Sequence, residues 1–524
     1  MKALIAVYNK DNLDFFARSL YELGWEILAT GGTFKKIKSA GIPVTSVADF
    51  TNQDELLEGR VKTLHPKIYA GILYRRNNSS DIAEMQKVNF EAIDLVACNL
   101  YPFFETVTDN NNILIEQAVE QIDIGGPTML RASAKNFNDV LSVSNPNSYQ
   151  EVVQYLKKFN NNIRDIPLNF KQKLAEDTFL HTAKYDALIA EYFNDGLNVF
   201  PNEKVFSISK IKELRYGENP HQEGALYKLN SVDSNTRANT GPIQHHGKDM
   251  SYVNVLDADA AYKLVCDLNE PALAIIKHTN PCCFASSDKS LSLLYDDALD
   301  NGDALSAFGG IVAVNRRIDK DFADALRKKV SPINGNKMFF EIIISPGIDD
   351  DALEHLKKKS KDLRIVTMNP YFFENNLNDY VTVHGGFLTQ TVDHSAVKFE
   401  HITGKNISVI EENDINIAWK VVKHIKSNAI AIVKNGILLG MGAGQPNRVE
   451  STKLAINAAG GRAVGAVLAS DAFFPFPDSI EVAGQAGIDI IIQPGGSIRD
   501  NDTITTVKKF KMTLFHTGIR HFRH

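Results

Sequence analysis

A lysine and a histidine stand side by side at the end of an apolar run. Residues 272–276 read Ala-Leu-Ala-Ile-Ile, and Lys277 and His278 follow directly. The run predicts a buried strand, and Asn280-Pro281 just beyond it predicts a turn. A base beside a cation suits a reaction that removes a proton while negative charge develops on an oxygen. The alternative is a strand end that simply reaches solvent, and these residues alone leave both interpretations open.

Two glycines join an expected strand to an expected helix at Thr30-Gly31-Gly32-Thr33. Glycine lets a ligand approach the backbone, and the free N–H groups at a helix start attract anions. Further along, Arg60 and Lys62 are alternate residues, so in extended backbone both would face one side and suit a phosphate. A ligand-free turn and a solvated edge are the respective alternatives. Neither stretch is a Walker sequence, because no Gly-Lys-Thr loop has the required spacing.

An acid, a glycine pair and a lysine occur together at Asp123, Gly125-Gly126 and Lys135. The glycines predict a turn before a helix, in which Arg131 and Lys135 lie four residues apart on one face. These groups suit proton shuttling near a carbonyl, and structural salt bridging is the alternative.

Two further stretches lie near the end of the sequence. Residues 470–478 combine three Phe and two Asp with prolines, so they suit either core packing or a wall for a flat heterocycle. Residues 517–524 are basic and aromatic. They form either a wet tail or a structured segment that brings Arg520, Phe522 and His524 into a site.

Two known signatures, one for dinucleotide binding and one for zinc binding, are incomplete in this chain. The run Gly440-Met441-Gly442-Ala443-Gly444 lacks the third glycine of a dinucleotide fingerprint. His221-Gln222-Glu223 with Pro281-Cys282 partly matches the zinc-deaminase signature, but Ala285 stands where that signature needs its second cysteine. We therefore expect no catalytic zinc.

Size and composition indicate an ordinary globular protein of two or more domains. The chain has 524 residues, 44% of them hydrophobic, and a net charge of −6. This charge disfavours general nucleic-acid binding, and no apolar stretch approaches the length of a membrane span. Four cysteines in so long a chain favour a reducing cytoplasm over a disulfide framework.

The spacing of apolar residues predicts α/β architecture. Apolar strands over 3–8, 25–29, 42–47 and 94–98 alternate with helices, which favours a parallel sheet covered by helices. A helical pattern covers 168–193, and the turn-rich residues 194–204 suggest a domain boundary. Beyond it we expect helices over 256–268 and 414–425 and a hairpin over 429–442. Strands and helices occur in both halves of this region, which permits an internal duplication.

Taken together, these residues resemble the bifunctional phosphoribosylaminoimidazolecarboxamide formyltransferase / IMP cyclohydrolase family of purine biosynthesis. The resemblance runs over essentially the whole chain. It is carried by motifs at residues 59–66, 98–103, 122–126, 214–222, 277–281, 427–429, 442–445, 470–476 and 520–524. Each motif is weak alone, but their shared order is highly specific.

The resemblance implies a methylglyoxal-synthase-like first domain over 1–196, including a helical linker, which closes the inosine ring. It implies a formyltransferase domain over 205–524, made of two cytidine-deaminase-like lobes without zinc. The formyl donor would be 10-formyltetrahydrofolate, and a monovalent cation remains open. Members are cytoplasmic homodimers with formyltransferase sites shared across the interface. The partners are therefore nucleotide and folate substrates, with no nucleic acid and no membrane.

For formyl transfer, the resemblance implies His278 as the base and Lys277 as the group that stabilises the oxyanion or protonates the departing folate nitrogen. Asn428 would orient the formyl oxygen. The implied nucleotide-binding and folate-binding residues are Arg215, Tyr216, Asn254, Phe308, Glu341, Phe473, Asp478, Arg520, Phe522 and His524.

For ring closure, the resemblance implies proton transfer and oxyanion support by Lys62, Tyr101, Asp123 and Lys135. The implied substrate-binding residues, most of them around the phosphate, are Lys10, Thr30, Gly31, Gly32, Thr33, Arg60 and Thr63. Attack by the carboxamide nitrogen occurs within one molecule, so positioning supplies much of the rate.

The chain departs from the family pattern in three places. Tyr8-Asn9 stands where the family usually has Ser-Asp, and Phe137 stands where it usually has His. Both changes concern the cyclohydrolase. Cys283 replaces a usual glycine, which would tighten the formyltransferase loop.

Two other functions compete with this one. One is a methylglyoxal-synthase-like lyase fused to a deaminase, against which Ala285 argues. The other is a non-enzymatic folate- or nucleotide-binding regulator, against which the intact Lys277-His278 argues.

Overall fold

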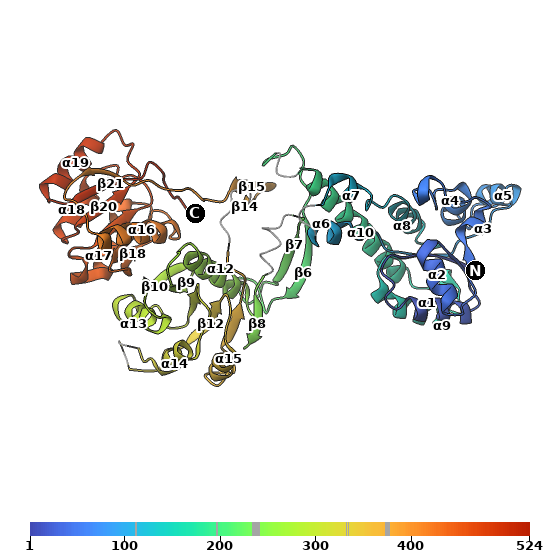
Figure 1. Ribbon diagram of the computed structural model, residues 1–524, viewed down its shortest axis with the longest axis horizontal. Helices are drawn as coiled ribbons and strands as arrows, with labels where there is room; N and C mark the ends of the chain where they lie inside the picture. Colours follow the sequence, from blue (N-terminus) through green and yellow to red (C-terminus); the bar gives the residue numbers. More distant parts are fainter. Residues whose placement is uncertain (110–112, 195–197, 233–240, 332, 334, 372–377) are drawn as a thin grey trace. The chain divides into compact units, whose positions relative to one another are not determined.

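The computed structural model describes residues 1–109, 113–194, 198–232, 241–331, 333, 335–371 and 378–524 (Figure 1). The chain divides into two compact units, Met1–Ser207 with Leu229–Ser234 and Ile208–Lys228 with Asn235–His524. No sequence pattern predicted that residues 229–232 would join the first unit. Residue 196, the expected end of the first domain, lies outside the described residues.

The first unit is built on a parallel sheet, as the apolar strands predicted. Its strand order is β3-β2-β1-β4-β5, and every neighbouring pair is parallel. The strands are β1 (Lys2–Ala6), β2 (Glu26–Ala29), β3 (Thr45–Ser46), β4 (Leu95–Cys98) and β5 (Leu141–Val143).

Helices cover both faces of this sheet and bury two separate apolar clusters. One face packs against α1 and α9, and the other against α4 and α8. The helices are α1 (Leu13–Glu22), α2 (Gly31–Ser39), α3 (Val47–Thr51), α4 (Pro66–Leu73), α5 (Ser79–Lys87), α6 (Phe103–Asp109), α7 (Ile115–Val119), α8 (Gly125–Lys135), α9 (Tyr149–Lys158) and α10 (Leu168–Asn194).

The second unit contains a twelve-stranded mixed sheet of order β16-β21-β20-β19-β17-β18-β10-β9-β11-β12-β13-β8. Its first lobe comprises β8 (Ile243–His246), α12 (Tyr252–Cys266), β9 (Ala272–Lys277), β10 (Asn280–Ser286), α13 (Leu291–Asn301), β11 (Gly310–Val314), α14 (Lys320–Lys328), β12 (Phe340–Ser345), α15 (Asp350–Lys357) and β13 (Arg364–Thr367). Two short hairpins stand apart from this sheet, β6 (Ser207–Glu213) with β7 (Ala225–Asn230) and β14 (Asn378–Val383) with β15 (Gly386–Thr391).

The second lobe repeats the first in the same order. It comprises β16 (Glu400–Thr403), α16 (Val409–Lys423), β17 (Ile430–Lys434), β18 (Ile437–Gly442), α17 (Arg448–Ala459), β19 (Val467–Ser470), α18 (Asp478–Gln485), β20 (Ile490–Gln493), α19 (Asp500–Lys509) and β21 (Thr513–His516). The bounds of α12 and α16 differ by 157 residues at both ends (252 to 409 and 266 to 423). The strand order is mirrored about the antiparallel β10–β18 pair, so the duplication that the sequence permitted is present.

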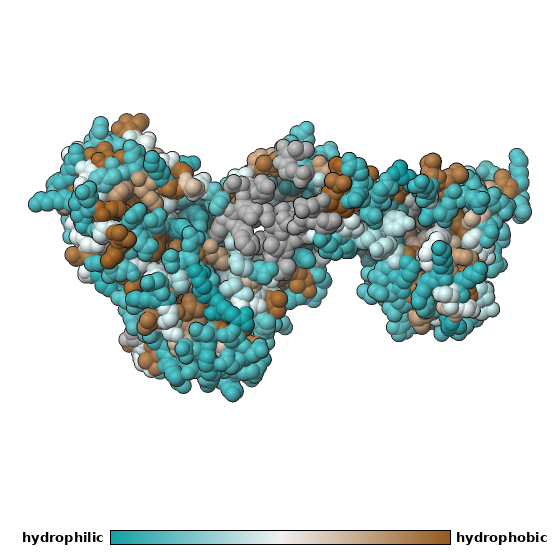
Figure 2. Space-filling view, in the orientation of Figure 1, coloured by the Kyte–Doolittle hydropathy of each residue, from teal (hydrophilic) through white to brown (hydrophobic). Residues whose placement is uncertain are grey.

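The two central helices α12 and α16 share one apolar cluster against the sheet. The outer helices of each lobe cover the opposite face in separate clusters. At the ends of the central helices, Asp267 and His424 are again 157 residues apart, and His424 Nε2 lies 2.9 Å from Asp267 Oδ2. Burial lowers the pKa of His424 to about 4, although Asp267 opposes this change. On the face shown in Figure 2, hydrophilic residues cover most of the surface and hydrophobic side chains gather in small groups.

A buried carboxylate fixes one tight hairpin in each lobe. Asp257 on α12 accepts the backbone N–H groups of His278 (3.2 Å) and Thr279 (2.7 Å). Asp414 on α16 accepts those of Asn435 (2.8 Å) and Gly436 (2.6 Å). All four turn residues have positive φ, between 53° and 75°, as a type I′ turn requires.

The expected turn at Asn280-Pro281 is wrong. The chain turns at His278-Thr279, and Asn280-Pro281 begins β10. The pairing register shifts between Pro281 and Cys283, and such a bulge tolerates a proline that cannot donate a ladder hydrogen bond. Lys277 therefore ends β9, and His278 lies at the tip of the hairpin.

We predict that Asp414→Ala lowers the free energy of unfolding by about 2–3 kcal/mol, because it leaves two turn N–H groups without their acceptor. Asp257→Ala should cost a similar amount. Urea unfolding monitored by circular dichroism measures both. Asp288→Ala removes an exposed carboxylate and serves as the control, with a change within about 0.5 kcal/mol. A loss at Asp414 no larger than that of the control would contradict the anchoring role.

Candidate active sites

The carboxyl ends of β1, β2 and β4 bring the predicted cyclohydrolase residues to one edge of the first sheet. Since these strands are parallel neighbours, the segments that follow them meet there. β1 is followed by Tyr8 and Lys10, β2 by Thr30-Gly31, and β4 by Tyr101. This edge is where the strand order reverses direction about β1, the usual place for a ligand in an open α/β sheet.

Two lysine ammonium groups converge on the glycines at the start of α2. A Cβ atom on Gly31 would lie 3.8 Å from Lys62 Nζ, and one on Gly32 would lie 3.8 Å from Lys10 Nζ. The first N–H groups of α2 have no partner within the helix. Two cations and a helix N-terminus together form a strongly anion-attracting environment.

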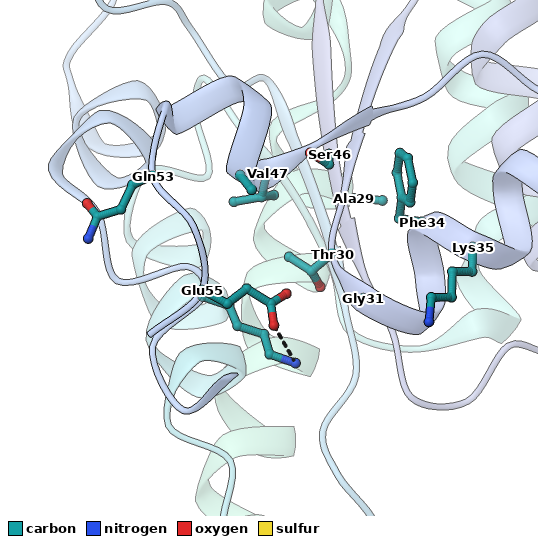
Figure 3. A pocket seen from close by; sticks show the side chains of 11 residues that line it. Ala29, Thr30, Gly31, Phe34, Lys35, Ser46, Val47, Gln53 and Glu55 are labelled. Carbon is teal, nitrogen blue, oxygen red and sulfur yellow. Dashed lines mark ion pairs between the residues drawn. The ribbon is translucent and has the colours of Figure 1, made fainter. Parts of the chain in front are cut away.

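A cavity of about 210 Å³ opens beside these glycines (Figure 3). Thr30, Gly31, Lys62 and Glu55 are among the residues that line it. Glu55 Oε2 lies 3.5 Å from Lys62 Nζ, and Figure 3 marks this ion pair with a dashed line. Glu55 was not among the predicted site residues. It is a carboxylate that a bound phosphate would compete with for the lysine.

Two residues expected at the phosphate are engaged elsewhere. The buried Thr33 hydroxyl donates to Val7 O (2.9 Å) and accepts from Val7 N (3.0 Å), so it ties α2 to the end of β1. Arg60 forms an ion pair with Glu120. Residues 57–59 form a 3-10 turn with Arg60 as its C-cap, so the expected extended backbone at 60–62 is wrong. Of the pair Arg60 and Lys62, Lys62 is the one that lies against Gly31.

A half-buried carboxylate lies next to this anion site. Asp123 Oδ1 accepts the N–H of Gly126 at 2.8 Å. A Cβ atom on residue 126 would lie 2.6 Å from Asp123 Oδ2, so this close approach requires glycine. Burial raises the pKa of Asp123, while the N–H groups of Gly126, Tyr101 and Gly125 and the charge of Lys62 oppose that increase. The backbone N–H of Tyr101 and the charge of Lys62 thus both stabilise the ionised form of Asp123.

Lys135 lies at the opposite end of α8 from this carboxylate, and its role in ring closure stays a prediction. It ends α8, whose first residue is Gly125, and ten residues of helix span about 15 Å. Its side chain is exposed. Thr63, in contrast, is buried with its Oγ1 2.6 Å from the position of a Cβ on Gly125.

Two further polar residues of this region were missed by the sequence analysis. Asn99 Oδ1 accepts the N–H groups of Tyr8 (2.7 Å) and Asn9 (2.9 Å), which fixes the loop after β1. Tyr69 is half-buried next to Thr63, and burial raises its pKa to about 12. The position of Asn99 directly after an apolar strand was the one available signal.

In the second unit, Lys277 and His278 occupy the hairpin described above. Lys277 Nζ donates to Phe308 O at 3.0 Å, so the ammonium group lies beside the predicted substrate residue Phe308. The Phe308 ring is exposed and lies 5.8 Å from the ring of Phe339. The His278 side chain is exposed.

A second cavity, of about 500 Å³, gathers five of the predicted formyltransferase residues. They are Asn428, Phe473, Asp478, Arg520 and Phe522. Aromatic rings and charged groups therefore share one concave surface, as expected for a site that holds a flat polar ligand. Lys277 and His278 do not line this cavity.

The amide of Asn428 has a fixed orientation. Its Oδ1 accepts from Arg448 Nη2 and its Nδ2 donates to Gln445 O, both at 2.7 Å. Arginine only donates and a carbonyl only accepts, so the amide cannot flip. Arg448 is itself buried in an ion pair with Asp471, which is 0% exposed. These contacts use one of the two amide N–H bonds and leave the other for a ligand.

Residues 521–523 are held in place, so the wet-tail alternative is wrong for this segment. Ser427 N donates to Arg523 O (2.8 Å), and Arg523 N donates to Ser427 Oγ (3.1 Å). His521 is buried, and its N–H donates to Asp471 O at 2.9 Å. This framework holds Arg520 and Phe522 at the cavity, with the Arg520 guanidinium 4.4 Å from the Phe522 ring centre.

The remaining predicted residues have local partners. Arg215 lies 5.1 Å from the ring of Tyr216, and the imidazole of His524 lies 5.7 Å from the ring of Phe522. Asn254 forms the capping box of α12 with Ser251. Glu341 pairs with Arg364 at 2.7 Å.

The Cys283 side chain packs against Gly302. It is fully buried in β10, and a Cβ on Gly302 would lie 2.8 Å from its Sγ. The sulfur thus fills space that a side chain at 302 would need.

Within the described residues, no group of three or more His, Cys, Asp or Glu side chains is arranged to hold a metal ion. Among those same residues, no helix has the length and apolar character needed to cross a bilayer.

Known families match most of this chain. A family described as "MGS-like domain" matches residues 12–128, and one described as "AICARFT/IMPCHase bienzyme" matches residues 133–458. A solved structure described as "Crystal structure of ForH" is 37% identical and covers 37% of this chain and 96% of its own, with a TM-score of 0.34.

Full-length relatives carry one shared description, "Bifunctional purine biosynthesis protein PurH". The protein from Caldicellulosiruptor saccharolyticus is 44% identical, that from Oceanobacillus iheyensis 43% and that from Bacillus subtilis 41%. The first two alignments cover 100% of this chain and 99% of the relative, and so does the third. With these matches and the two sites described above, the chain belongs to the AICARFT/IMPCHase bienzyme family.

Proposed function

We propose that this chain catalyses the last two steps of IMP synthesis. The second unit transfers a formyl group from 10-formyltetrahydrofolate to the 5-amino group of phosphoribosylaminoimidazolecarboxamide (AICAR), which gives the formylated product (FAICAR). The first unit then closes FAICAR to IMP with loss of water. The observation that carries the proposal is the presence of two separate sites, one anion-attracting and one aromatic-walled, each of which contains residues of the family motifs. Four free cysteines fit a reducing cytoplasm.

In formyl transfer, the amine nitrogen forms a bond to the formyl carbon, and the bond from that carbon to the folate nitrogen breaks. His278 takes the proton that the amine loses. Lys277 stabilises the oxyanion and supplies a proton to the departing folate nitrogen. The free N–H of Asn428 donates to the formyl oxygen, where negative charge develops. The fixed amide of Asn428 supports this role, because a preorganised donor needs no rearrangement during the reaction.

We propose a homodimer in which each formyltransferase site draws on both copies. The reason is that Asn428 lines the cavity of about 500 Å³, whereas the Lys277-His278 hairpin does not. Two-fold symmetry would let the hairpin of one copy complete the cavity of the other.

In ring closure, the nucleotide phosphate binds between Lys10, Lys62 and the glycines of α2. The carboxamide nitrogen forms a bond to the formyl carbon of the same molecule, and Asp123 accepts a proton from this nitrogen. The former formyl oxygen then receives that proton and the proton of the formylated amine, its bond to carbon breaks, and it leaves as water. Tyr101 supports this oxygen. Binding of the phosphate fixes one end of the substrate and limits how the reacting groups can move, which supplies most of the rate advantage.

The direct test incubates purified protein with AICAR and 10-formyltetrahydrofolate and follows IMP by chromatography. IMP formation is expected. Accumulation of FAICAR would contradict the ring-closing role of the first unit, and no folate turnover would contradict the whole proposal.

We expect Lys277→Ala to lower formyl transfer by at least about a hundredfold, because it removes a charge that stabilises the transition state. Cyclisation of supplied FAICAR should stay intact. The matched control is Lys434→Ala, 157 residues later, since Lys434 also ends a hairpin strand and donates to a carbonyl, Val464 O at 2.7 Å. Comparable losses in these two variants, or equal loss of both activities in Lys277→Ala, would contradict this assignment.

The dimer proposal predicts complementation between inactive variants. Lys277→Ala and Asn428→Ala should each be inactive in formyl transfer. When the two are co-expressed in equal amounts, half of the dimers are mixed and one of their two sites is intact. We therefore expect about a quarter of the wild-type activity. Continued absence of activity in a confirmed mixed dimer would place each site within one copy.

The pH dependence of ring closure should report Asp123. Its ionised form is the base, so cyclisation should fall as pH drops through its pKa, which burial raises above the ordinary value. The charge of Lys62 opposes that rise. Lys62→Met should therefore move the acid limb of kcat/KM to higher pH, whereas the exposed-lysine control Lys87→Met should leave it in place. An unmoved limb in Lys62→Met would exclude Asp123 as the titrating base.

A further inference from the structure

Tyr8 lies between the two parts of the proposed cyclohydrolase site. On one side, Lys10 Nζ donates to Tyr8 O at 3.0 Å and lies 5.9 Å from the Tyr8 ring centre. The same ammonium group reaches Gly32, where the phosphate would bind. On the other side, the Tyr8 ring meets the Tyr101 ring edge-to-face, with centres 5.9 Å apart and planes at 72°.

These distances leave no more than about 12 Å between the Lys10 ammonium and the centre of the Tyr101 ring. An extended nucleoside monophosphate can bridge that span. With its phosphate at Lys10 and its reacting groups at Tyr101, its base would pass over the ring of Tyr8. The ring is open to receive it, because Tyr8 is 50% exposed and Tyr101 is 43% exposed.

The Tyr8 ring is also restricted in position and orientation before a ligand binds. Asn99 fixes the backbone on which it stands by accepting the N–H groups of Tyr8 and Asn9. The contact with Tyr101 restricts the plane of the ring. A rigid exposed aromatic ring loses little entropy when a flat heterocycle stacks on it.

We propose that Tyr8 is the stacking platform for the imidazole ring of FAICAR and for the base of the product, IMP. This role rests on the proposed ring closure and deepens it. The family pattern usually has a serine here, so the extra aromatic contact is a property of this chain. Tyr8 makes the site select a planar base, while Lys10 and the glycines bind the phosphate.

The test compares a ligand that has the base with one that lacks it. Isothermal titration calorimetry of the full chain measures the affinity for IMP and for ribose 5-phosphate. Tyr8→Leu should weaken IMP binding about tenfold, because base–aromatic stacking is lost, and leave ribose 5-phosphate binding unchanged. Tyr8→Phe should bind both as the wild type does. FAICAR cyclisation should show a higher KM in Tyr8→Leu.

The matched control is Tyr21→Leu, which alters a tyrosine of similar exposure, 49%, on α1. It should change neither affinity. Formyl transfer in the second unit should be equal in all variants and reports that the chain is folded. Equal weakening of both ligands in Tyr8→Leu would overturn the proposal, because the loop would then act only through Lys10. Unchanged IMP binding would overturn it too. A wild-type chain that fails to cyclise FAICAR would instead overturn the underlying function.

Discussion

A buried carboxylate that accepts both N–H groups of a tight turn is the constraint on which the formyltransferase region depends. Asp257 reaches from α12 to the tip of the β9–β10 hairpin and fixes His278 and Thr279 in a left-handed conformation. Neither residue favours that conformation alone, so the two hydrogen bonds and the hairpin pairing must stabilise it. Asp257 is buried, and burial raises the pKa of its carboxyl, while the two turn N–H groups oppose this rise. The position of the proposed base therefore depends on a carboxylate 21 residues earlier in the sequence.

The second lobe contains the same device with different chemistry. Asp414 holds Asn435-Gly436, a turn sequence that adopts positive φ readily. The first lobe puts a histidine at the corresponding position and accepts a less favourable turn. Lys277 and Lys434 both end their strands and both donate to a backbone carbonyl. The lobes thus share a framework and differ in the residue at the hairpin tip, which is His278 in the first lobe and Asn435 in the second.

The sequence predicted features that depend on neighbouring residues. Alternating apolar strands and helices predicted the parallel sheet of the first unit. Asn435-Gly436 correctly marked the β17–β18 hairpin of the second unit. Gly31-Gly32 marked the start of α2, where Lys10 and Lys62 lie close to the backbone. The turn at His278-Thr279 was missed because Asn280-Pro281 is the stronger local breaker, and the bulge that accommodates Pro281 is a property of strand pairing. Lys135 shares a motif with Asp123, but an intervening helix carries it away. The partners of Thr33 and Asn428 lie on other elements, so only the folded chain reveals them.

The contact between Asp267 and His424 has a consequence for the history of the chain. Corresponding residues of the two lobes touch each other there, so this position lies on the local two-fold axis. In an ancestor made of two identical polypeptides, any side chain at this point would meet its own copy, and two aspartates would repel. Fusion into one gene frees the copies to differ, and a carboxylate can then face an imidazole. Such complementary contacts bind the lobes in one relative orientation and oppose a return to separate halves.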